Sequence, residues 1–148
     1  MEVKRINGSI HMLYFFLRHI EVKHEENDTT TYTYSPDRFE PLEVSFPDVK
    51  NAWEVLTAVS FGNFNECPAT DVIVEKSKYW YEKYGAEITE ISHDSIKYSI
   101  PDSLDLEKAN ELKNEILQFA PDSISFNESE TEFAKNIIKD KYFYLWWD

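Results

Sequence analysis

Residues 142–148 read Tyr-Phe-Tyr-Leu-Trp-Trp-Asp, and this aromatic stretch is the most informative part of the chain. Aromatic residues are enriched in β-strands, so the composition predicts a strand. Successive side chains of a strand point to opposite faces of the sheet, which places Trp146 and Trp147 on opposite sides. If one face is open, one of the two is exposed there beside Asp148. The simpler interpretation is an interior strand, covered on both faces, that pins the last helix.

Three helices are predicted upstream by apolar spacing and by end signals. Ser129 and Glu132 match the capping box, in which two side chains satisfy the first free amides of a helix. An apolar stripe over residues 106–119 predicts the preceding helix. A further stripe over 69–84 predicts a helix that ends at Gly85, where a left-handed residue is favoured. Each stripe needs an apolar surface to pack against.

Strands are predicted between these helices. Apolar and polar residues alternate over 96–100 and less regularly over 86–91, and a turn at 92–95 joins the two segments. Ile124 and Phe126 predict a further short strand before the last helix. The second half of the chain therefore mixes strands and helices without strict alternation.

The N-terminal part predicts mostly strand. Within residues 10–22, most large apolar side chains occupy every second position, which is typical of a strand. A short buried helix is also compatible with this apolar run. Residues 29–34 are rich in β-branched and aromatic side chains and would complete a hairpin. Residues 42–46 alternate as a half-buried strand, and a helical stripe follows over 49–59.

The fold class predicted is α+β. We expect a mixed, largely antiparallel sheet with about four helices packed mainly on one face, plus an N-terminal β-hairpin. The length of 148 residues suits one domain, 1–148. Within it, residues 1–40 would form the hairpin extension and residues 41–148 the α+β core.

The chain is strongly acidic. It has 28 Asp and Glu against 15 Lys and Arg, a formal net charge of −13. Such a surface repels phosphate backbones and anionic membranes, so neither nucleic acid nor a membrane is expected as a partner. Charge favours a basic protein partner by steering its approach. Solubility alone is the simpler interpretation.

Cysteine usage bears on the compartment. Cys67 is the single cysteine, so an internal disulfide is excluded, which fits a reducing cytosol. The apolar run over 10–17 is far shorter than a membrane span of roughly 20 residues. We therefore expect a cytoplasmic location.

No catalytic set, metal site or cofactor site is predicted. His19, Glu21 and His24 do not give a compact three-ligand arrangement on a strand or on a helix. Cys67 follows Glu66, and a neighbouring acid disfavours a thiolate nucleophile. Three glycines cannot supply the familiar phosphate-binding loops. An enzyme is therefore the less favoured class.

Several short motifs of the second half of the chain occur together in one known family. They are Trp80, Tyr84-Gly85-Ala86, His93-Asp94, Phe119, Pro121-Asp122 and Trp146-Trp147-Asp148. With these motifs the chain resembles a bacterial family catalogued as a domain of unknown function, number 4253. The resemblance runs from roughly Leu42 to the C-terminus and implies an α+β domain of bacterial origin, with no activity attached. The chain has Ala120 where the family often has Cys, which argues against indispensable cysteine chemistry there.

The leading hypothesis is a non-enzymatic acidic protein that binds a protein partner, in the manner of an immunity protein or an antitoxin. Small size, acidity and aromatic content motivate it. One alternative is an enzyme of unrecognised type, with an acidic cleft that contains His93. Another is a homo-oligomeric structural module that buries a C-terminal tryptophan across a dimer. The candidate binding residues are Trp146, Trp147, Asp148, His93 and Asp94.

Overall fold

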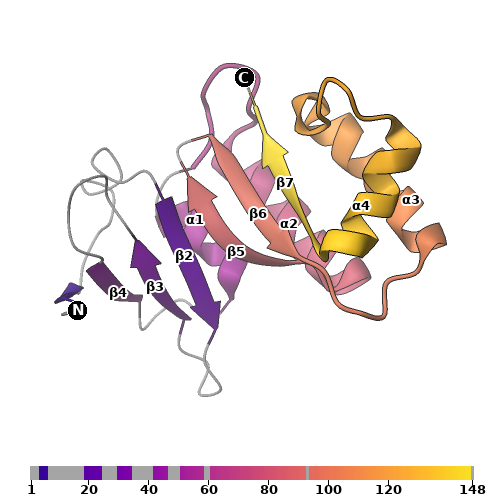
Figure 1. The fold of residues 1–148 in the computed structure, drawn as a ribbon. Coiled ribbons are helices and arrows are strands. Elements are labelled where there is room, and N and C mark those ends of the chain that lie inside the picture. Colours follow the sequence, from indigo (N-terminus) through magenta and orange to yellow (C-terminus); the bar gives the residue numbers. More distant parts are fainter. Residues whose placement is uncertain are drawn as a thin grey trace.

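The computed structural model describes residues 4–6, 19–24, 30–34, 42–46, 51–58, 61–92 and 94–147, with side chains only within 51–57, 61–92 and 94–147. Helices and strands intermix along this part of the chain, so the predicted α+β class is confirmed (Figure 1). The elements are β1 (Lys4–Ile6), β2 (His19–His24), β3 (Thr30–Tyr34), β4 (Leu42–Phe46), the 3-10 turn η3 (Ala52–Glu54), α1 (Val55–Ala58), α2 (Thr70–Tyr84), β5 (Glu87–Ser92), β6 (Ser95–Ser99), α3 (Leu106–Phe119), the 3-10 turn η4 (Pro121–Ser123), α4 (Glu130–Asp140) and β7 (Tyr142–Trp146).

The described strands form one sheet in the order β1-β4-β3-β2-β5-β6-β7. β1 runs parallel to β4, and the other neighbouring pairs are antiparallel. β7 is an edge strand that pairs with β6 alone (Figure 1). β2 and β3 are antiparallel neighbours, but residues 25–29 lie outside the described residues, and the N-terminal hairpin stays a prediction.

Local signals place the helix ends where the sequence predicts them. α2 ends at Gly85, whose φ of 73° is left-handed and whose N–H donates to the carbonyl oxygen of Tyr81. At the start of α4, the Ser129 hydroxyl accepts from the Glu132 amide, and the Glu132 carboxylate accepts from the Ser129 amide. This capping box fixes the helix that leads directly into β7.

Two sequence predictions in this region need correction. Ile124 and Phe126 form no strand, because the chain passes from η4 through a turn in which Phe126 is fully exposed. The helix predicted over 49–59 is, within its described residues, only the turn η3 followed by the four residues of α1. In both places an apolar pattern of few residues was compatible with more than one backbone conformation.

The core lies between the helices and one face of β5, β6 and β7. Trp80 of α2 sits at its centre, fully buried, and makes edge-to-face contacts with Tyr98, Phe119 and Phe143. α2 lies behind the sheet, and α3 packs on α4 at the end of the sheet nearest β7 (Figure 1). Within the described part of the chain, no helix combines the length and apolarity needed to cross a membrane.

Candidate functional site

β7 divides its side chains between the core and the open face of the sheet. Phe143 and Leu145 are buried, whereas Tyr142, Tyr144 and Trp146 are 38%, 40% and 39% exposed. We call these three exposed residues the aromatic row. An interior strand covered on both faces is therefore the wrong interpretation, because buried and exposed side chains alternate along β7.

Lys97 of β6 lies against the aromatic row. Its Nζ is 4.4 Å from the ring centroid of Tyr142 and 5.7 Å from that of Tyr144. Sheet register causes this approach, because Lys97 is the cross-strand partner of Tyr144 on one side and of Glu90 on the other. The three side chains thus follow one line across β5, β6 and β7 on the open face.

Glu90 connects the lysine with the tyrosines. Its Oε1 is 3.8 Å from Lys97 Nζ, and its Oε2 accepts a hydrogen bond from Tyr144 Oη at 3.4 Å. Partial burial and the nearby Glu90 carboxylate both raise the pKa of Tyr144, so the phenol stays protonated and able to donate. We call Tyr142, Tyr144 and Glu90 the ammonium cage, since all three contact the Lys97 head group.

Trp146 is exposed but held in place. Its indole Nε1 donates to Asp94 Oδ2 at 3.0 Å, and Asp94 Oδ1 accepts from Ser92 Oγ at 3.2 Å. The backbone N–H of Trp146 donates to Ser123 Oγ at 3.0 Å on the outer edge of β7. An exposed aromatic ring fixed by such bonds loses little conformational freedom when it is covered.

The structure brings together two of the five residues predicted for binding, Trp146 and Asp94. Trp147 is buried, with its ring 6.0 Å from that of Phe61, and belongs to the core. His93 and Asp148 lie outside the described residues.

Sequence reasoning did not select the members of the ammonium cage or Lys97. The alternation of residues 142–146 could have pointed to Tyr142 and Tyr144, because they share the parity of Trp146. Glu90 and Lys97 carry no comparable signal, since only the cross-strand register brings them to the tyrosines.

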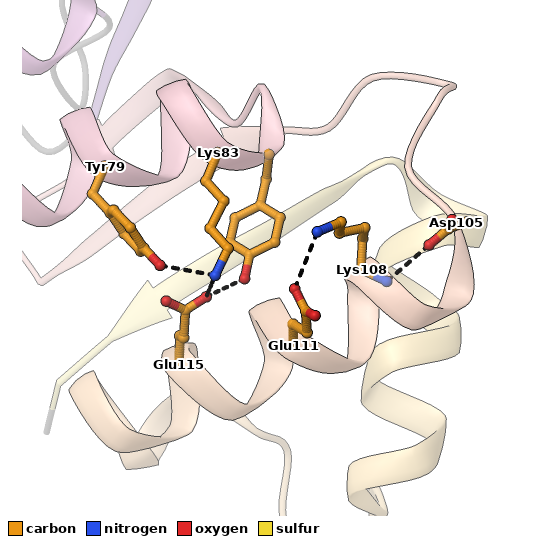
Figure 2. A network of polar contacts seen from close by, with 7 residues as sticks. Tyr79, Lys83, Asp105, Lys108, Glu111 and Glu115 are labelled. Carbon is orange, nitrogen blue, oxygen red and sulfur yellow. Dashed lines mark hydrogen bonds and ion pairs between the residues drawn. The ribbon is translucent and has the colours of Figure 1, made fainter.

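A second polar network joins α2 to α3 (Figure 2). Lys83 Nζ donates to Tyr79 Oη at 2.9 Å and is 3.8 Å from Glu115, which also accepts a hydrogen bond from Tyr84 Oη. Hydrogen bonds with Tyr79 and Tyr84 raise the pKa of Lys83, and burial raises that of Tyr84. Because the lysine is charged and the phenol is protonated, both can bind the Glu115 carboxylate, and these contacts hold α2 against α3.

Other groups that could carry chemistry are placed unfavourably. Burial raises the pKa of the Cys67 thiol to about 11, so it is protonated at neutral pH and a poor nucleophile. Within 51–58, 61–92 and 94–147, no three His, Cys, Asp or Glu residues gather as metal ligands. A hollow of about 30 Å³ beside Ser77 and an open depression of about 610 Å³ beside Tyr79 include neither Asp94 nor Trp146 in their walls.

The fold and the site define an α+β protein in which β5, β6 and β7 bury one face against the core and present exposed aromatic side chains of β7 on the other. The chain belongs to the family described as domain of unknown function DUF4253, whose family model matches residues 45–148. The resemblance seen in the sequence is thereby confirmed. Comparison with curated proteins and with solved structures gives no match.

Proposed function

We propose that this chain is a non-enzymatic binding protein that engages a basic segment of a partner protein, as an immunity protein or an antitoxin does. The observation that carries the proposal is the aromatic row: Tyr142, Tyr144 and Trp146 are exposed side by side, next to polar residues of β5 and β6 on the same face. Single exposed apolar residues are common on protein surfaces, but three in one line form a contiguous patch.

The physical properties of the row suit protein recognition. Tryptophan and tyrosine dominate the binding energy of interfaces because each buries a large area with few rotatable bonds. Trp146 is held by Asp94 and Ser123 before any partner arrives. Its ordering therefore costs little upon binding, and more of the contact energy contributes to affinity.

Charge supports a basic partner. The net charge of −13 attracts cations at long range. At short range, aromatic faces and carboxylates alternate along the row, with Glu90 beside Tyr144 and Asp94 beside Trp146. A guanidinium group can stack on an aromatic ring and hydrogen-bond to a carboxylate at its edge at the same time.

The proposal is tested with a synthetic peptide of alternating arginine and serine, titrated into wild type, Trp146→Ala and Phe126→Ala by calorimetry. We expect Trp146→Ala to weaken binding by about tenfold or more, as for a central interface aromatic. Phe126 is the matched control, because it is a fully exposed aromatic on a different segment. Its replacement should change affinity less than about twofold, because an isolated exposed side chain away from an interface has little energetic role.

Two outcomes would contradict the proposal. Equal affinity of all three proteins would mean that the peptide binds through general acidity and not through the row. A wild-type dimer in sedimentation that Trp146→Ala dissociates would identify a second copy of the chain, not a basic partner, as the occupant of this face.

A further inference from the structure

We infer that Lys97 is a built-in competitor for the partner: its ammonium group fills the ammonium cage in the free protein, and a cationic side chain of the partner displaces it. The inference rests on the proposed function, since it concerns the occupant of the same face. It adds the chemical identity of the partner's contacting group, which is an alkylammonium or guanidinium group that binds between Tyr142 and Tyr144.

The cage has the composition with which proteins bind organic cations. The two tyrosine rings stand nearly perpendicular, at 80°, with their centroids 5.6 Å apart. Lys97 Nζ lies over the Tyr142 ring, and Glu90 supplies a carboxylate 3.8 Å from it. Aromatic faces attract a cation through their quadrupole, and a nearby carboxylate adds a direct charge interaction.

Lys97 is positioned to leave the cage. The Lys97 and Glu90 side chains are 24% and 25% exposed, so water and a partner can reach their head groups. Ion pairs near the surface are weak, and a flexible four-carbon stem can carry the ammonium into solvent. As a tethered group, however, Lys97 competes at a high effective concentration that a single free cation does not match.

Displacement therefore favours a partner segment with more than one cation. One cationic side chain would stack on Trp146 beside Asp94, and a neighbouring one would enter the cage. The contact at Trp146 keeps the second cationic side chain near the cage. Its effective concentration there can then match that of the tethered Lys97 ammonium group. The arrangement discriminates against isolated lysine or arginine residues on unrelated proteins.

The arginine–serine peptide is titrated into wild type, Lys97→Ala and Lys78→Ala. Both substitutions remove one positive charge, but Lys78 is an exposed residue of α2, which lies on the other side of the sheet from the aromatic row (Figure 1). We expect Lys97→Ala to bind about fivefold to tenfold more tightly than wild type, because its ammonium group no longer competes for the two tyrosine rings. Lys78→Ala should gain less than about twofold at physiological salt, since charges more than about 8 Å apart are largely screened there. Equal gains in the two variants would overturn the inference.

A second measurement follows the displacement in wild type. In the free protein, the Tyr142 ring current should shift the NMR signals of the Lys97 ε-methylene protons upfield. At saturation with the peptide these signals should return to ordinary lysine values, and signals that stay upfield would overturn the inference even if Lys97→Ala does not fold.

The two measurements separate this inference from the proposed function. If binding depends on Trp146 but Lys97 stays in the cage, the role of Lys97 as a competitor is rejected and the proposed function stands. Absence of Trp146-dependent binding in wild type and in Lys97→Ala would reject both.

Discussion

The two faces of strand β7 both carry aromatic side chains, but these side chains differ in burial and in their contacts. On its inner face Phe143 is buried and stacks on Tyr98, with centroids 4.8 Å apart and planes at 8°. On its outer face Tyr144 is 40% exposed and contacts Lys97 and Glu90. Neighbouring residues of the same chemical type thus serve either the core or the surface according to parity. Aromatic content predicts the strand, but it does not identify the core.

The largest expected difference comes from replacing one aromatic residue on each face. Phe143→Ala removes a buried ring and leaves a cavity, so the free energy of unfolding should fall by roughly 3–5 kcal/mol. Tyr144→Ala should lower it by about 1 kcal/mol, the scale of one cross-strand pair. Urea titration of both variants measures the difference. Equal losses would mean that the outer face is as closely packed as the inner one.

The inner face also holds a buried polar pair, Ser77 and Tyr98, whose oxygens are 2.7 Å apart. Ser77→Ala leaves the phenol without its partner, and we expect a loss of about 1–3 kcal/mol in the free energy of unfolding. Adding Tyr98→Phe removes the orphaned hydroxyl and should recover part of that loss. A double variant that loses the sum of both single effects in chemical denaturation would show that the two hydroxyls are not coupled.

The buried Cys67 thiol should make the stability of the protein depend on pH in the alkaline range. Its pKa is raised from 9.0 in the unfolded chain to about 11 by burial, so between these values the unfolded state releases a proton that the folded state retains. The contribution of this thiol to stability should therefore be constant below about pH 9 and fall by about 1–2 kcal/mol as the pH rises toward 11. Cys67→Ala should show a shallower decline between pH 9 and 10, before tyrosine ionisation contributes. Identical pH profiles of the two proteins would contradict the burial of this thiol.

The sequence predicts those parts of the structure whose cause is local. The capping box at Ser129, the glycine at residue 85 and the alternation in β7 each act within a few residues, and all three are found. The short strand expected at Ile124 and Phe126 is wrong, because two alternating apolar residues say nothing about whether a neighbouring strand exists.

Only part of the candidate site can be predicted from local sequence pattern. Parity correctly separates Trp146 from Trp147, but which of them is exposed depends on the helices that cover one face. The cage is beyond local pattern, because Lys97 meets Tyr142 and Tyr144 through the pairing of β6 with β7. A lysine in a strand has no feature that distinguishes a ring contact from ordinary solvation.

The smallest expected effect comes from a serine on the outer edge, matched to the buried Ser77. Ser123 Oγ accepts the backbone N–H of Trp146, and Ser123→Ala removes this hydrogen bond by the same substitution. Because the site faces solvent, water can replace the hydroxyl, and the free energy of unfolding should change by no more than about 0.5 kcal/mol. The Trp146 amide should nevertheless exchange its hydrogen faster than in wild type, since its bond is now to mobile water. A stability loss as large as that of Ser77→Ala would mean that water does not reach this edge of β7, which would contradict the exposure of Trp146 on which the proposed binding depends.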